Sequence, residues 1–277
     1  MTFNQIVHQI HSKQSFLCVG LDPDRSLFPL HLQAKPDAIY LFNKEIIDAT
    51  SPYAIAYKPN TAFYEAEGAS GWQQLTQTIR YIRQYHPNIL IIADAKRCDI
   101  GNTAHRYAKA FYQELNVDAV TLSPYMGMDA IDPFLSYKDK WSIVLAITSN
   151  DTASDFALQP LTNGKPLYQA VIQKCVSKGS KEQLMFVVGA TRPQLLAEVR
   201  AMVPEHFLLV PGVGAQGGGV AEVAKYGMNR DCGLLVNVSR DIIYAGNGLD
   251  FAQTAGKKAE EIAQEMGRLL AATQFSI

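Results

Sequence analysis

The chain has 277 residues, of which 48% are hydrophobic and 18% are charged, as in an ordinary globular protein. Its net charge of −1 and its pI of about 6.6 provide no electrostatic footprint for nucleic acid or an anionic membrane, so we expect neither as a partner. The four cysteines form no C-x-x-C pair, and neither a signal-peptide pattern nor a membrane-spanning apolar run is visible. We therefore expect a cytoplasmic protein with reduced thiols.

Eight short apolar runs recur along the chain, and their starts are separated by 23 to 42 residues, close to the length of a βαβ unit. They lack a clean alternation of apolar and polar residues, which is typical of parallel strands covered on both faces. We predict strands at 16–21, 53–58, 89–96, 117–122, 142–148, 184–189, 207–211 and 233–238.

The segments between these runs carry helical stripes of apolar residues, which favour packing against a core. The stripes are Ile39, Phe42 and Ile46; Trp72, Leu75, Ile79 and Ile82; Ala104, Tyr107, Ala108, Phe111 and Leu115; Leu167, Val171 and Cys175; and Phe251, Ala255, Ala259, Ile262, Met266 and Leu269. The last stripe is expected to close the chain against the first.

Eight such units predict a single α/β domain over residues 1–277, a (β/α)8 TIM barrel with its active site at the carboxyl ends of the strands. An open doubly wound sheet remains the alternative. The longest gap between units, 149–183, is rich in polar residues, glycine and proline. We interpret it as an elaborated loop over the barrel mouth followed by a helix.

Charged residues end two neighbouring predicted strands. Lys58 ends the second, and Asp94 and Lys96 end the third, with Asp99 three residues beyond. Residues two apart in a strand project from the same face, and charges placed there must be paired to stay ionised. On its own, D-x-K-x-x-D is more typical of a solvated strand end, but Lys58 on the adjacent strand favours a catalytic network.

A second polar region follows the seventh and eighth predicted strands. Residues 211–219 read P-G-V-G-A-Q-G-G-G, and 237–240 read N-V-S-R. The corresponding loops of such barrels often bind phosphate, which Arg240 and Gln216 could hold. The same stretch spells G-x-G-x-x-G, but Asp231 precedes its strand, whereas the ribose-binding acid of a dinucleotide site ends one. A purely structural glycine turn is the other alternative.

Taken together, these motifs resemble those of orotidine 5′-monophosphate decarboxylases. The matching segments are G-L-D at 20–22, Lys58, D-A-K-R-C-D-I-G-N-T at 94–103 and P-G-V-G-A-Q-G-G from Pro211. They follow the order of that family and cover the first three and last two strands. T-S-N at 148–150 and N-V-S-R at 237–240 resemble the longer-chain, type 2 bacterial-like branch.

The resemblance implies decarboxylation of a nucleoside monophosphate without metal or cofactor. Lys96 would protonate C6 of the pyrimidine, and Asp94 would oppose the departing carboxylate. Lys58 and Asp99 would complete the charged network, with Asp99 reaching the partner's site in a homodimer.

The resemblance also implies a set of substrate contacts. Asp22, together with Lys58, would hold ribose hydroxyls, and Thr103 would contact the ribose of the neighbouring subunit's ligand. Ile100 would form an apolar wall, and Ser149 would contact the pyrimidine. The phosphate-end residues are Gln216, Ser239 and Arg240.

Two other functions remain as alternatives. Magnesium-dependent sugar-phosphate decarboxylases or aldolases of the same barrel superfamily share the D-x-K-x-x-D run but carry an acidic residue where Lys58 stands. A non-catalytic phosphate-binding barrel would be expected to have lost one of the charged residues, and all are present. The six histidines show no metal-ligand spacing, and we assign them no role.

Overall fold

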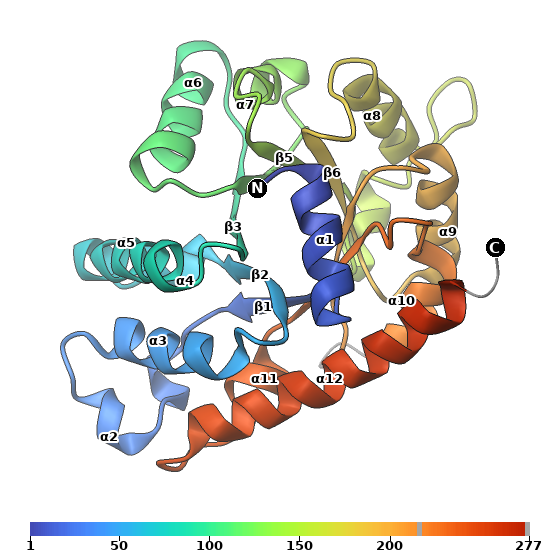
Figure 1. Cartoon of the computed structure of the whole chain (residues 1–277). Coiled ribbons are helices and arrows are strands. Elements are labelled where there is room, and N and C mark those ends of the chain that lie inside the picture. Colours follow the sequence, from blue (N-terminus) through green and yellow to red (C-terminus); the bar gives the residue numbers. More distant parts are fainter. Residues whose placement is uncertain (215–217, 275–277) are drawn as a thin grey trace.

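The computed structural model describes residues 1–214 and 218–274, and its eight strands close into a parallel barrel (Figure 1). Each strand pairs with its sequence neighbours, and the barrel closes where Leu17, Cys18 and Val19 pair with Val236, Asn237 and Val238. This confirms the (β/α)8 fold and excludes the open sheet. The strands are β1 (Leu17–Leu21), β2 (Ala54–Pro59), β3 (Leu90–Arg97), β4 (Ala119–Leu122), β5 (Trp141–Ile147), β6 (Leu184–Val188), β7 (Leu208–Pro211) and β8 (Leu234–Val238).

Helices surround the barrel and connect its strands. They are α1 (Phe3–Lys13), α2 (Leu30–Gln33), α3 (Ala38–Thr50), α4 (Thr61–Glu65), α5 (Gly68–Tyr85), α6 (Gly101–Lys109), α7 (Asp132–Leu135), α8 (Leu167–Val176), α9 (Pro193–Met202), α10 (Val220–Gly227), α11 (Arg240–Ile243) and α12 (Phe251–Gln274). Short 3-10 turns are η1 (Arg25–Leu27), η3 (Met128–Ala130) and η4 (Asp151–Asp155), and α6 continues as a π-helical turn, η2 (Ala110–Glu114). No described helix has the length and apolarity needed to cross a membrane.

The strands are buried because the barrel interior covers one face and the helices cover the other. Every residue of β1, β2, β6 and β8 is buried. As predicted, the last helical stripe packs on the first: the rings of Phe42 on α3 and Phe251 on α12 stack with centroids 5.3 Å apart. This contact packs the helix that follows β1 against the last helix of the chain.

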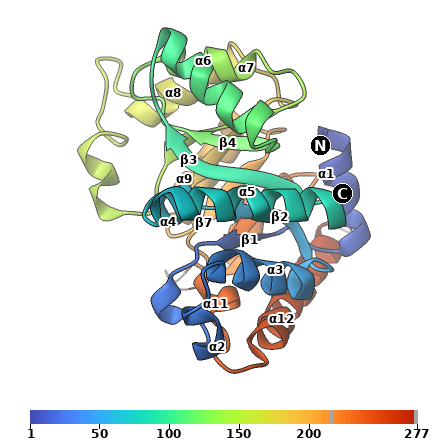
Figure 2. The same cartoon turned by 90° about the vertical axis from the view of Figure 1, so that its left-hand side faces the viewer.

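The segment between β5 and β6 contains η4, a loop and α8, and its loop lies at the end of the barrel away from both termini (Figure 2). Of the stripe predicted for α8, Cys175 is buried as expected, but the other two buried positions lie one residue after those predicted. Tyr168, Ile172 and Cys175 are buried, whereas Leu167 and Val171 are only half-buried. Tyr168 was left out of the stripe, but its ring is buried while its hydroxyl donates to Glu198 Oε2 at 2.6 Å.

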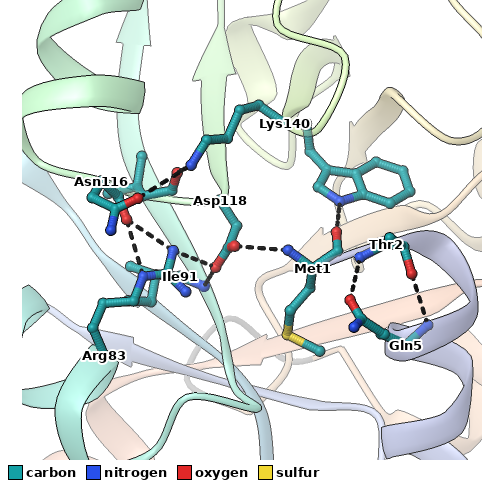
Figure 3. A network of polar contacts seen from close by, with 10 residues as sticks. Met1, Thr2, Gln5, Arg83, Ile91, Asn116, Asp118 and Lys140 are labelled. Atoms are coloured by element: carbon teal, nitrogen blue, oxygen red, sulfur yellow. Dashed lines mark hydrogen bonds and ion pairs between the residues drawn. The ribbon is translucent and has the colours of Figure 1, made fainter.

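Helix α1 crosses the amino-terminal end of the barrel and is held there by a buried polar network (Figure 3). The Met1 ammonium donates to Asp118 Oδ1 at 2.9 Å, and Asp118 Oδ2 accepts from the backbone N–H of Ile91 and from Arg83, both at 2.8 Å. The Trp141 indole N–H donates to the Met1 carbonyl at 2.8 Å. This end of the barrel is therefore covered, and the carboxyl ends of the strands carry the site described below.

His206, between α9 and β7, is 9% exposed, and neither ring nitrogen has a hydrogen-bond partner within the described chain. The Arg200 guanidinium binds its backbone carbonyl at 2.7 Å. Burial, reinforced by the Arg200 charge, lowers the pKa of His206 from 6.5 to about 4. Protonating this side chain therefore opposes folding.

We predict that His206 makes the protein sensitive to mild acid. The pKa of His206 is lower in the folded than in the unfolded chain. Its contribution to the free energy of unfolding is therefore complete above about pH 6.5, and about 3 kcal/mol of it is lost as the pH falls towards 4. Urea unfolding at several pH values should show a shallower loss of stability in His206→Phe than in wild type. The exposed-histidine control His8→Gln should follow wild type. Parallel curves for His206→Phe and wild type would contradict this role.

Candidate active site

Two adjoining cavities, of about 210 and 280 Å³, open at the carboxyl ends of the strands. Both are lined by Lys58, Asp94 and Pro211. The smaller is also lined by Asp22, Asn60, Gly212, Val213, Asn237, Ser239, Arg240 and Asp241, and the larger by Lys96, Thr121, Leu145, Thr148, Ser149, Asn150, Val187 and Leu209. The charged strand ends predicted from sequence thus meet in one place.

Asp94 is the centre of this arrangement. Its Oδ2 accepts from Lys58 Nζ and its Oδ1 from Lys96 Nζ, both at 2.6 Å. The side chains of Lys58 and Asp94 are only 5% and 10% exposed, whereas that of Lys96 is 49% exposed. The buried pair therefore anchors a third charge that faces the open cavity.

The charges keep one another ionised despite burial. Burial alone would raise the pKa of the Asp94 carboxyl, but the ammonium groups of Lys58 and Lys96 outweigh it and hold this pKa well below its usual range. Burial would likewise lower the pKa of Lys58, but Asp94 and Asp22 outweigh it and raise this pKa. The site therefore holds a carboxylate between two ammonium groups.

Adjacent strands bring these groups together. Strand β2 pairs with β3 through Ala56 and Leu90, and a further bridge joins Asn60 to Asp94 at the strand ends. Asn60 then caps α4, because its Oδ1 accepts the N–H of Ala62 at 3.3 Å. Lys58 is thereby fixed beside the carboxylate of the next strand.

The loop after β7 forms the other end of the smaller cavity. Gly214 has a φ of +83°, and a Cβ there would collide with the Asp241 carboxylate, so only glycine fits. Its N–H donates to the Gly218 carbonyl at 3.1 Å, which ties the ends of the loop together. Gln216, the predicted phosphate ligand, lies outside the described residues.

Arg240 begins α11 and is exposed at this cavity, and Ser239 precedes it. The Ser239 hydroxyl donates to the carbonyl of Gly20 at 3.3 Å, and a Cβ at Gly20 would lie 2.6 Å from Ser239 Cβ. Glycine at position 20 therefore lets β1 approach β8 closely. Nearby, Asp22 Oδ1 is buried and has no hydrogen-bond partner among residues 1–214 and 218–274, so it is available to a ligand hydroxyl.

Three predicted site residues lie outside both cavities. Asp99, Ile100 and Thr103 are at the start of α6, where Asp99 Oδ1 accepts the N–H of Ile100 at 2.8 Å. Ile100 is 50% exposed, and Thr103 is also exposed. Within one chain, Asp99 therefore does not join the Lys58–Asp94–Lys96 network.

Several polar residues that line the cavities had no role predicted from sequence, among them Asn60, Thr121, Asn237 and Asp241. Asn60 and Asn237 lie in the polar strand ends that drew attention to Lys58 and Arg240. Thr121 is a single hydroxyl within the apolar run of β4, and a threonine in a strand carries no signal by itself. Its contacts with β3 could not be inferred from one chain.

Larger cavities, of about 430 and 560 Å³, lie beside α1 at the opposite end of the barrel. The first is lined by basic and acidic side chains in equal number, Lys138, Lys181 and Arg230 against Asp139, Glu182 and Asp231. Within residues 1–214 and 218–274, no group of three histidine, cysteine or acidic side chains is arranged to hold a metal ion. The charged network at the strand ends is therefore the stronger candidate site.

Comparison with known proteins identifies the family of this chain. Residues 15–255 match the model of the orotidine 5′-phosphate decarboxylase / HUMPS family. The chain belongs to the orotidine 5′-phosphate decarboxylase family. It is accordingly an enzyme of the carboxy-lyase class.

Relatives of this family match over nearly their whole length. The chain is 53% identical over 271 residues to orotidine 5′-phosphate decarboxylase of Flavobacterium johnsoniae (98% of each chain) and 51% identical over 270 residues to that of Phocaeicola vulgatus (98% of this chain, 99% of the relative). Among solved structures, OMP decarboxylase of Leishmania donovani superposes with a TM-score of 0.84 at 36% identity (98% of this chain, 99% of that one).

Proposed function

We propose that the protein converts orotidine 5′-monophosphate to uridine 5′-monophosphate and CO2 in pyrimidine biosynthesis, without metal or cofactor. The observation that carries this proposal is the Asp94 carboxylate held between Lys58 and Lys96 beside a cavity that extends to Arg240. The names of the relatives in Flavobacterium johnsoniae and Phocaeicola vulgatus agree with it. Four unpaired cysteines are consistent with action in the cytoplasm.

The chemistry requires a cation at the reacting carbon. When the bond between C6 and the carboxylate breaks, CO2 leaves and the electron pair stays on an sp² carbon without an adjacent carbonyl to accept it. The Lys96 ammonium faces the open cavity and can stabilise this charge as it develops and then transfer its proton to C6. Solvent then reprotonates the lysine.

Asp94 has two roles in this proposal. It orients the Lys96 ammonium through the 2.6 Å contact, and it stands against the substrate carboxylate that departs. Lys58 and Lys96 hold the pKa of Asp94 below its usual range, so a negative charge stands there before the substrate binds. Magnesium-dependent proteins of the same barrel superfamily have an acidic metal ligand where this chain has Lys58. The Lys58 ammonium instead places a positive charge at that position.

The two ends of the cavity suit the rest of the nucleotide. Asp22, whose Oδ1 has no partner in the described part of the chain, and Lys58 would hold ribose hydroxyls. Ser149, which lines the larger cavity, would contact the pyrimidine. Arg240 and Ser239, with Gln216, would bind the phosphate. Because the phosphate is remote from C6, its binding energy can be used to organise the reacting groups.

The ultraviolet absorbance of orotidine 5′-monophosphate, followed with purified protein and a chelator, tests the proposed reaction. We expect the substrate band to disappear with release of CO2, at the same rate with and without the chelator. Activity that requires added Mg²⁺ would favour the metal-dependent alternative, and folded protein without activity would favour the phosphate-binding barrel.

We predict that Lys96→Ala abolishes turnover but retains the affinity for uridine 5′-monophosphate, because the variant lacks the proton donor and keeps the phosphate end. Lys96 has a φ of +45°, a left-handed conformation that is about equally unfavourable for lysine and for alanine. The substitution therefore adds little backbone strain. Calorimetric titration with the product measures binding in the same preparation. Near-normal turnover would remove Lys96 from the mechanism.

Arg240→Ala is predicted to weaken binding of uridine 5′-monophosphate roughly tenfold to a hundredfold, the effect of losing a charge-assisted hydrogen bond. Binding of uridine, which lacks the phosphate, should change little. Comparing the two ligands in wild type and variant isolates the phosphate contribution. Equal losses for both ligands would exclude a phosphate role for Arg240.

We further propose a homodimer in which Asp99 and Thr103 complete the partner's site. These residues lie outside the cavities of their own chain. Large apolar side chains are also exposed in the loops after β3, β4 and β5, where Ile100, Tyr125, Met126 and Phe156 are 50%, 79%, 54% and 64% exposed. An interface there would bury apolar surface and bring Asp99 towards a second site.

Mixing two inactive variants tests this arrangement. In the proposed dimer, each site takes Lys96 from its own chain and Asp99 from the partner. A mixed dimer of Asp99→Asn and Lys96→Ala therefore has one site in which both residues are substituted and one site in which both are intact. Random exchange of subunits should therefore restore about a quarter of wild-type activity. Two Lys96→Ala preparations mixed together are the control. No recovery, with exchange shown by mass spectrometry, would contradict a contribution of Asp99 across the interface.

A further inference from the structure

Strand β3 is irregular where it carries the charged residues. Its partner β4 pairs Ala93 with Val120 and then Arg97 with Leu122, so that three residues, 94–96, stand opposite Thr121 alone. Lys96 has a φ of +45°, in the left-handed region that costs a side-chain-bearing residue roughly 1–2 kcal/mol. Such a bulge persists only if other contacts stabilise its backbone.

Thr121 occupies the break in the ladder. Its Oγ1 accepts the backbone N–H of Lys96 at 2.9 Å and donates to Asp94 Oδ1 at 3.0 Å. The directions are fixed, because the amide can only donate and the ionised carboxylate can only accept. The residue is 1% exposed, so water does not readily replace either bond.

A single hydroxyl thus connects the backbone of Lys96 with the carboxylate that orients its ammonium group. Asp94 Oδ1 accepts both the Thr121 hydroxyl and Lys96 Nζ, which closes a ring of contacts across the bulge. Without the hydroxyl, the Lys96 N–H loses its partner and the Asp94 carboxylate is free to turn. Either change moves the ammonium, whose position sets the rate in the proposed reaction.

We propose that Thr121 is a positioning residue for the decarboxylation: its hydroxyl fixes the β3 bulge that aims Lys96 and Asp94 into one cavity. This inference rests on the proposed function. It differs from a packing role, for which the branched shape of the side chain would suffice. The two roles predict different behaviour for valine, which keeps the shape, and for serine, which keeps the hydroxyl.

The test compares Thr121→Val, Thr121→Ala and Thr121→Ser in turnover of orotidine 5′-monophosphate and in binding of uridine 5′-monophosphate. We expect kcat of the Val and Ala variants to fall roughly tenfold to a hundredfold, with product affinity within about threefold of wild type. Thr121→Ser should retain most of kcat. Thr78→Val, which removes an equally buried hydroxyl from α5, should leave kcat unchanged.

Several results would overturn the proposal. One is a kcat for Thr121→Val within about twofold of wild type, and another is an equal loss in the serine and valine variants. Failure of both Val and Ala variants to fold, with Thr121→Ser folded, would make the hydroxyl a requirement of folding instead. An inactive wild type would refute the proposed function itself, whereas an active wild type with an equally active Thr121→Val would refute only the role of Thr121.

Discussion

The ion pairs of Asp94 are the constraint on which the site depends. Burying a lone carboxylate or ammonium is so costly that the group would lose its charge, and removing one partner of a buried pair typically destabilises a protein by about 3–5 kcal/mol. Asp94 is stable as an ion because Lys58 and Lys96 each bind one of its oxygens. The same contacts that allow the charges to be buried also aim Lys96 at the cavity.

The barrel provides the rigid support that such an arrangement requires. Strands β2, β3 and β4 deliver Lys58, Asp94 and Thr121 from neighbouring positions. The network around Asp118 lies at the opposite end of the barrel, and α3 and α12 pack against each other through the rings of Phe42 and Phe251. A strained lysine and a bulged strand can therefore persist at one end, because packing elsewhere fixes the surrounding backbone.

The sequence alone predicted the features that follow from short-range patterns. Eight buried strands and their order were visible because parallel strands are apolar on both faces, and Lys58, Asp94 and Lys96 were conspicuous as charges ending such runs. The role of Thr121 was not visible, because it arises from a register shift between two strands. On α8, Cys175 was predicted correctly, but Tyr168 was missed because tyrosine combines an apolar ring with a polar tip.

Other site residues exceed what one chain can reveal. Asp99 and Thr103 were named from family resemblance, and they lie at the start of α6, outside the cavities of their own chain. Ser149 lines the cavity, but its neighbours Thr148 and Asn150 do so too, so position along the sequence does not single it out. The phosphate contact of Gln216 likewise stays a prediction.

The ionisation of Asp94 is the most direct test of the account. Carbon-13 NMR of protein labelled at the aspartate carboxyls, with the Asp94 signal assigned by its loss in Asp94→Asn, would follow this group as the pH is lowered. We predict a constant chemical shift between pH 7 and about pH 4, where an ordinary aspartate is already half protonated. A midpoint at or above the ordinary value would contradict it, because Asp94 would then not be held as a carboxylate by its two lysines.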